Sequence, residues 1–151
     1  MKKILIIEDD ASIRENLSEI LSLSGYEVIT AENGKTGVEK SMKEQPHLIL
    51  CDITMPVLDG YGTLNILSRD PRTSSIPFIY LTAKSENEDF RKGMSLGADD
   101  FITKPFDDVA LLSTIEARLR KHAQLTKASD VQTGSLEHFI NEARATEALS
   151  H

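Results

Sequence analysis

The sequence has no tryptophan, a single cysteine and few aromatic residues, which make up 5% of its 151 residues. A lone thiol, Cys51, cannot form an intramolecular disulfide and has no Cys-x-x-Cys partner for a zinc site. No apolar run approaches the ~18–20 residues of a membrane span, and no basic start with an apolar run marks a signal peptide. We therefore expect a reduced, cytoplasmic protein with Cys51 buried and no contact with a membrane.

Positive charge is also in deficit. There are 17 Lys and Arg residues against 24 Asp and Glu, which leaves a formal charge of −7. A field of this sign disfavours binding to nucleic acids and anionic membranes, so we expect no direct nucleic-acid partner. An acidic site for a cation fits the charge better. The length suits about one domain of ~100–200 residues and excludes a two-domain enzyme.

Five short apolar runs recur along the chain, and several are unbroken, as in strands covered by helices on both faces of a parallel sheet. Between them lie segments with helical periodicity, the clearest carrying Ile13, Leu17, Ile20 and Leu21 and ending near Gly25. This alternation predicts a doubly wound α/β fold in which a five-stranded parallel sheet is flanked by five helices. The expected strands are Lys3–Ile7, Tyr26–Ala31, His47–Cys51, Pro77–Thr82 and Phe101–Thr103. The other expected helices are 35–44, 61–68, one opening at Ser85 and one capped by Asp107.

Ligands of such sheets bind outside the carboxyl ends of the strands. Each polar residue found there has an ordinary structural explanation when taken alone, for example as a helix cap. Their joint occurrence favours a site for a charged ligand. The residues at these strand ends are Glu8, Asp9 and Asp10 after the first strand, Asp52 after the third, Thr82 at the end of the fourth, and Lys104 at the end of the fifth.

If Glu8, Asp9 and Asp52 converge, they cannot all stay ionised without a compensating cation. Lys104 supplies one positive charge and leaves a formal −2. Carboxylates with a backbone carbonyl and waters are ligands that Mg²⁺ prefers. Mg²⁺ beside a carboxylate, an amine and a hydroxyl is suited to handling a phosphoryl group.

With these residues in view, Met1–Lys121 resembles the receiver domain of bacterial two-component response regulators. The resemblance covers about four-fifths of the chain and implies a flavodoxin-like fold with strand order 2-1-3-4-5. The segment 122–151 lies outside it. The matching motifs are Ile4-Leu5-Ile6-Ile7-Glu8-Asp9-Asp10, Cys51-Asp52-Ile53-Thr54-Met55-Pro56-Val57-Leu58-Asp59-Gly60, Leu81-Thr82-Ala83 and Phe101-Ile102-Thr103-Lys104-Pro105-Phe106.

The resemblance implies that Asp52 accepts a phosphoryl group from a phosphohistidine on a sensor histidine kinase or phosphotransfer protein. Asp9 and Asp52 then resemble direct Mg²⁺ ligands, joined by the backbone carbonyl of Thr54. Glu8 acts through a metal-bound water, and Lys104 pairs with a phosphoryl oxygen. Asp10 is expected beside the site or as a helix cap, and the Lys104-Pro105 bond is similar to the family's cis peptide bond.

In the family, the response to phosphorylation is read out at the fourth helix, fifth strand and fifth helix. Thr82 resembles the switch hydroxyl that moves toward the phosphoryl group. Phe101 stands where many members have tyrosine, so its ring can pack inward but offers no phenolic hydroxyl; the alternative is an ordinary core aromatic. The implied function is a phosphorylation-dependent switch, not an enzyme with a separate substrate, that regulates an unknown partner protein. A phosphorylation-dependent homodimer stays open.

Two other classes compete with this interpretation. A Mg²⁺-dependent phosphohydrolase with an aspartate nucleophile, of haloacid-dehalogenase type, carries that nucleophile after the first strand, whereas Asp52 follows the third. A flavodoxin-like nucleotide carrier needs a glycine-rich phosphate loop where this chain has three acidic residues. Residues 122–151, with an apolar stripe after Ser135, are expected to be a surface extension, a docking or self-association helix, or the start of a further domain.

Overall fold

The computed structural model describes residues 1–83 and 96–125 of the chain. The last described element is a helix over residues 108–125. The elements before it are β1 (Lys3–Ile7), α1 (Ala11–Leu23), β2 (Glu27–Ala31), α2 (Gly34–Glu44), β3 (Leu48–Asp52), α3 (Gly60–Ser68), β4 (Phe78–Ala83) and β5 (Asp100–Lys104).

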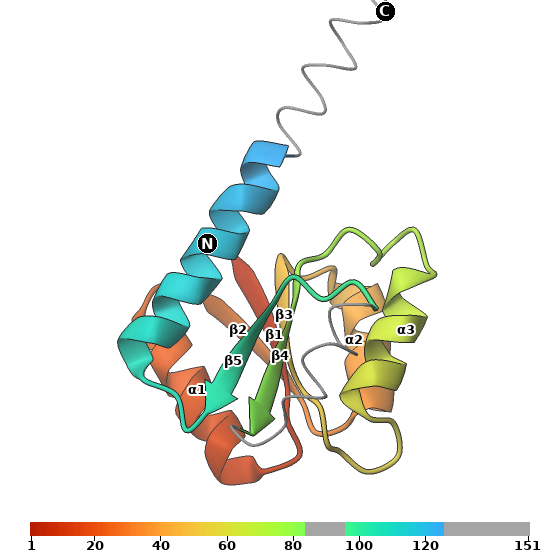
Figure 1. Cartoon of the computed structure of the whole chain (residues 1–151), viewed down its shortest axis with the longest axis horizontal. Helices are drawn as coiled ribbons and strands as arrows, with labels where there is room; N and C mark the ends of the chain where they lie inside the picture. Colours follow the sequence, from red (N-terminus) through yellow and green to blue (C-terminus); the bar gives the residue numbers. More distant parts are fainter. Residues whose placement is uncertain (84–95, 126–151) are drawn as a thin grey trace, which may run out of the picture. The chain divides into compact units, whose positions relative to one another are not determined.

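The five strands form one parallel sheet in the order β2-β1-β3-β4-β5, which confirms the order that the resemblance implies (Figure 1). β3 lies in the centre, and all five of its residues are buried. A central strand needs apolar side chains on both faces, which explains its unbroken apolar run. Most strand boundaries differ by one residue from the expected ones, and Asp52 is the last residue of β3 instead of the first after it.

Helices cover both faces of the sheet and bury two apolar cores (Figure 1). On one face, Leu17 and Leu21 of α1 and Leu111 and Ile115 of the last helix pack against alternate residues of the strands. On the other, α2 and α3 cover the remaining alternate residues, with Leu64 of α3 among the buried ones. Because both faces of the sheet are buried, the strands are held in place, and so are the residues at their carboxyl ends.

The helix ends follow from capping residues. The Asp10 side chain accepts a hydrogen bond of 3.1 Å from the Ile13 N–H and so caps α1, one of the two roles expected for it. Asn33 and Asp59 cap α2 and α3 in the same way. Gly25 follows α1 with φ of 92°, a conformation that glycine adopts without strain. The helix expected to open at Ser85 lies outside the described residues.

The chain divides into two units, Met1–Leu119 and Arg120–His151. The described part of the second unit is the helical segment 120–125. The apolar stripe expected after Ser135 lies outside the described residues, and the predicted domain boundary at Lys121 stays a prediction. Within residues 1–83 and 96–125, no helix has the length and apolar character needed to cross a membrane.

Candidate functional site

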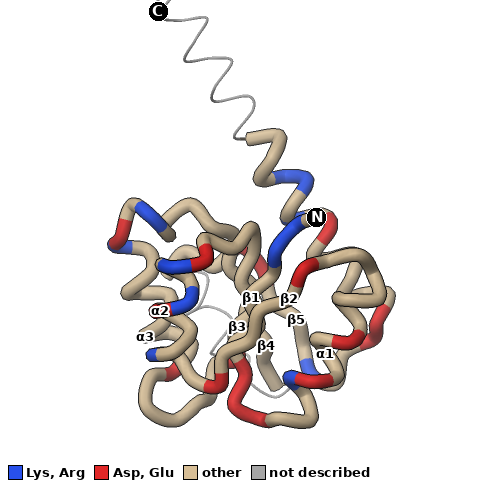
Figure 2. Tube along the Cα trace, turned by 180° about the vertical axis from the view of Figure 1, so that it is seen from behind, with Lys and Arg blue, Asp and Glu red and all other residues tan. Residues whose placement is uncertain are grey.

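Three carboxylates meet at the carboxyl end of the sheet. Glu8 and Asp9 follow β1, and Asp52 ends β3, the neighbouring strand. One oxygen from each lies within 4.8 Å of the others, so the three residues together could hold a single metal ion. Glu8 and Asp52 are buried, whereas Asp9 is exposed. The sequence prediction that these residues converge is therefore confirmed in the geometry, and Figure 2 marks the acidic stretch between β1 and α1 in red.

Lys104, the last residue of the edge strand β5, places its ammonium group beside this carboxylate cluster. Its Nζ lies 2.7 Å from Oε1 of Glu8 and 3.2 Å from Oδ1 of Asp52. The ammonium thus bridges the carboxylate that follows β1 and the carboxylate that ends β3. Three carboxylates and one ammonium have a formal charge of −2 when all are ionised, which a divalent cation would neutralise.

Glu8 is the most deeply placed of the acidic residues. Its side chain is fully buried, and its Oε2 has no hydrogen-bond partner among the described residues. Burial raises the pKa of Glu8 to about 8, assisted by the neighbouring Asp52 carboxylate and opposed by Lys104. A buried carboxylate oxygen without a donor is costly unless a cation or water meets it. The atoms that could bind a metal here are carboxylate oxygens. Hard cations such as Mg²⁺ prefer such ligands, so the cluster fits that ion.

The loop after Asp52 is held close to the strand it leaves. The Gly60 N–H donates a hydrogen bond of 2.7 Å to the Ile53 carbonyl. A Cβ at Gly60 would lie 2.5 Å from the Asp52 carbonyl oxygen and 2.8 Å from Cα of Ile53. Only glycine allows this approach, so Gly60 lets α3 start directly against the end of β3.

The remaining predicted site residues lie around this cluster. Thr82 is buried near the end of β4, and its Oγ1 donates a long hydrogen bond of 3.4 Å to the Ala83 carbonyl. Thr54 is exposed on the loop after β3. Phe101 pairs in register with Tyr80, and their rings lie 5.4 Å apart. The Lys104-Pro105 bond is cis, as the resemblance implies. The chemical roles expected for these residues stay predictions.

Sequence reasoning missed one contact at the site. Arg14 of α1 donates from its guanidinium to the backbone carbonyl of Glu8 at 2.8 Å. Its position, one turn into the helix that follows the acidic residues, is the signal that could have identified it, because such a side chain can reach back to the loop.

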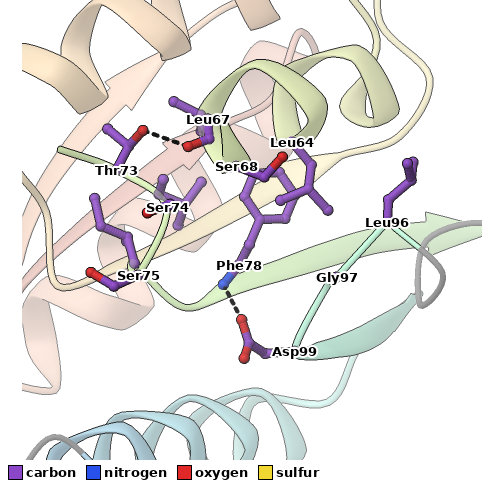
Figure 3. Close-up of a pocket in the computed structure, with 12 residues that line it drawn as sticks. Leu64, Leu67, Ser68, Thr73, Ser74, Ser75, Phe78, Leu96, Gly97 and Asp99 are labelled. Atoms are coloured by element: carbon purple, nitrogen blue, oxygen red, sulfur yellow. Dashed lines mark hydrogen bonds between the residues drawn. The ribbon is translucent and has the colours of Figure 1, made fainter. Parts of the chain in front are cut away.

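A hollow of about 220 Å³ lies at the opposite end of the strands from the acidic cluster, near the starts of β3 and β4 (Figure 3). Its lining combines apolar side chains such as Leu64 and Phe78 with hydroxyls such as Ser74 and Ser75. Among the described residues that line it, the one carboxylate is that of Asp99, which already accepts a hydrogen bond of 2.7 Å from the Phe78 N–H. These described residues therefore do not form a cluster of charges like that of the acidic site.

The fold and the acidic cluster together define a signalling domain of the receiver class. The chain belongs to the response regulator receiver domain family, whose sequence profile matches residues 4–116. Receiver domains are signalling switches and not enzymes that turn over a separate substrate.

Similar proteins agree with this assignment. The DNA-binding dual master transcriptional regulator RpaA of Synechocystis sp. is 39% identical over 129 residues, 85% of this chain and 54% of that protein. The structure of the receiver domain of a histidine kinase from Syntrophus aciditrophicus is 38% identical with a TM-score of 0.75, covering 80% of this chain and 92% of that one.

A second similar structure holds a metal ion. It is the receiver domain of a sensor histidine kinase from Pseudomonas aeruginosa, with a magnesium ion coordinated in the active site cleft. It is 26% identical to this chain with a TM-score of 0.73, covering 78% of this chain and 97% of that one. The chain spans about half the length of the first curated relatives it matches.

Proposed function

We propose that this receiver domain works as a switch by accepting a phosphoryl group on Asp52 in a Mg²⁺-dependent reaction. The observation that carries the proposal is the convergence of Glu8, Asp9 and Asp52 within 4.8 Å, bridged by Lys104. The magnesium ion in the similar receiver structure from Pseudomonas aeruginosa supports the choice of metal.

The residues divide the chemistry between them. An oxygen of Asp52 forms a bond to phosphorus while the bond from phosphorus to the donor nitrogen breaks, and the leaving imidazole takes a proton from solvent. Lys104, 3.2 Å from Asp52, neutralises charge on the transferred group. Mg²⁺, held by Asp9, Asp52 and the Thr54 carbonyl with Glu8 acting through water, would supply further charge neutralisation and orientation.

Phosphorylation then changes the charge at the end of β3. A carboxylate with one negative charge becomes an acyl phosphate with nearly two and with new acceptor oxygens. In this scheme the Thr82 hydroxyl moves toward these oxygens, and the Phe101 ring, which already lies 5.4 Å from that of Tyr80, packs further inward. A local change in charge is thereby converted into a change at the surface around β5.

The partners follow from this scheme. The phosphoryl donor is a histidine kinase or a phosphotransfer protein, and the output is a partner that distinguishes the two forms of the β5 surface. Curated relatives are named as transcriptional regulators, RpaA among them as DNA-binding, and the chain covers about half of their length. Two outputs fit this scheme. The surface could contact a separate partner protein, or it could control a DNA-binding region like that of the longer relatives. The cytoplasmic location and the homodimer stay predictions.

Incubation with a small phosphodonor and Mg²⁺ tests the proposal. One phosphoryl group per chain is expected in the wild type, none after chelation of Mg²⁺ and none in Asp52→Asn. Steady release of phosphate over many turnovers from a stable phosphate ester would favour the phosphohydrolase instead. A wild-type chain that takes up no phosphoryl group from several donors would contradict the proposal.

A further inference from the structure

Arg14 contacts the backbone of all three consecutive acidic residues that follow β1. Its Nη1 donates to the Glu8 carbonyl at 2.8 Å and, at a longer 3.4 Å, to the Asp9 carbonyl. Its own N–H donates to the Asp10 carbonyl at 2.9 Å, as the first turn of α1 requires. One residue thus fixes the path of the chain from β1 into α1.

Both backbone polar groups of Glu8, its N–H and its carbonyl, are hydrogen-bonded. Its N–H donates to the carbonyl of Ala31, the last residue of β2, at 3.0 Å. Since β2 ends there, the guanidinium of Arg14 supplies the donor that a longer strand would have offered to the Glu8 carbonyl. Fixing this peptide also fixes where the Glu8 side chain leaves the backbone, and hence its 2.7 Å contact with Lys104.

The positive charge of Arg14 is kept on the backbone side of the loop. Among the ion pairs of residues 1–83 and 96–125, the Glu8 and Asp52 carboxylates pair with Lys104 and not with Arg14. The guanidinium therefore leaves the carboxylate oxygens available to a cation. An arginine that salt-bridged to these oxygens would instead compete with the metal.

We propose that Arg14 is a positioning residue for the metal site, which holds Glu8 and Asp9 so that their carboxylates converge on Asp52. The inference rests on the proposed function, because it assumes that the acidic cluster binds Mg²⁺. Groups that orient metal ligands commonly matter nearly as much as the ligands themselves.

Lys40 offers a matched control. It lines the same hollow as Arg14, of about 240 Å³, and its Nζ donates to a backbone carbonyl, that of Thr30. Arg14→Met and Lys40→Met each remove one cation together with its contacts to backbone carbonyls, but only the first removes contacts to the acidic loop. Arg14→Lys keeps the charge and loses the planar fork of donors.

The test is the dissociation constant of Mg²⁺, measured by titration calorimetry on the whole chain. Arg14→Met should weaken binding by about 10-fold or more, Arg14→Lys by less, and Lys40→Met should keep the wild-type affinity. In the metal-free protein, hydrogen exchange at the Glu8 amide should accelerate in Arg14→Met and not in Lys40→Met. This second measurement reports the loop without reference to metal or phosphorylation.

Wild-type affinity in Arg14→Met overturns the inference while leaving the metal site intact. An equal loss in Lys40→Met also overturns it, because the effect would then come from the general loss of positive charge. A wild-type chain that binds no Mg²⁺ overturns the proposed metal site, and the Arg14 inference with it.

Discussion

Nζ of Lys104 lies 2.7 Å from Oε1 of Glu8, although 96 residues separate the two in the sequence. Glu8 follows β1 and Lys104 ends β5, and β3 and β4 stand between those strands in the sheet. The long lysine side chain reaches across the carboxyl end of the sheet to a buried carboxylate. This contact joins the acidic loop to β5. We propose that the surface around β5 is the one a partner recognises after phosphorylation.

Replacing Lys104 with methionine should destabilise the protein, since the buried carboxyl groups of Asp52 and Glu8 lose the ammonium that bridges them. Removing one member of a buried pair costs about 3–5 kcal/mol. Lys104 is partly exposed, so solvent screening reduces the expected loss in the free energy of unfolding to about 1–3 kcal/mol. Lys104→Arg should keep most of the stability. Urea unfolding of both variants without Mg²⁺ measures the difference, and equal stability of Lys104→Met and the wild type would show that the bridge contributes nothing.

Mg²⁺ should stabilise the folded chain, because the carboxylate cluster exists only in the folded state. Mg²⁺ at 100 times its dissociation constant would add about 2.7 kcal/mol. Asp9→Asn removes a proposed ligand and should reduce the rise in melting temperature with added Mg²⁺. Asp10→Asn is the matched control, because the adjacent side chain caps α1 and asparagine can cap it equally well. A loss in Asp10→Asn as large as in Asp9→Asn would indicate nonspecific screening.

Much of this site was predictable from the sequence because parallel strands all end at one edge of the sheet. The apolar runs located β1, β3 and β5, and the polar residues after them, such as Glu8, Asp52 and Lys104, had to meet. The strand order came from the resemblance, since periodicity does not specify which strands are neighbours.

Two features of the site depend on tertiary structure, and the sequence alone does not determine them. The contact of Arg14 with the Glu8 carbonyl requires that β2 end at Ala31, so that the donor must come from elsewhere. The complete burial of Glu8, beside an exposed Asp9, depends on how the folded chain packs around the carboxyl ends of the strands. The sequence does not show which of two adjacent acidic residues is buried, because their exposure depends on tertiary packing.

Gly60→Ala should disturb the loop that carries the proposed phosphoacceptor. Its Cβ would meet backbone atoms of Asp52 and Ile53 at 2.5 and 2.8 Å, which cannot move without shifting β3. We expect a loss of about 1–3 kcal/mol in the free energy of unfolding, typical of overpacking.

The neighbouring Gly62 provides the control for this substitution. A Cβ there would first meet Cδ1 of Leu58, the far end of a flexible side chain. Gly62→Ala should therefore be nearly neutral in the same urea titration. Similar losses in the two variants would show that the approach to the β3 backbone is not the cause.

His47 should contribute a loss of stability in mild acid, against the opposite contribution of Glu8, whose raised pKa makes the folded chain hold a proton more tightly there. Nδ1 of His47 accepts a hydrogen bond of 2.9 Å from the Lys3 N–H, and partial burial together with the charges of Lys2 and Lys3 lowers its pKa below 6.5. The unfolded chain therefore takes up a proton before the folded chain does, and stability present above pH 6.5 is lost as the pH falls. The melting temperature of His47→Gln relative to the wild type should therefore rise as the pH falls below 6.5. A difference that stays constant with pH would exclude this contribution of His47.

The central claim is that Asp52 receives the phosphoryl group, and mapping the modified residue tests it most directly. Borohydride reduces an aspartyl phosphate to homoserine, which peptide mass spectrometry locates in the sequence. After treatment with a phosphodonor and Mg²⁺, we predict homoserine at residue 52 of the wild type and none anywhere in Asp52→Asn. Homoserine at residue 9 or 10, or an adduct that persists unchanged in Asp52→Asn, would contradict the account.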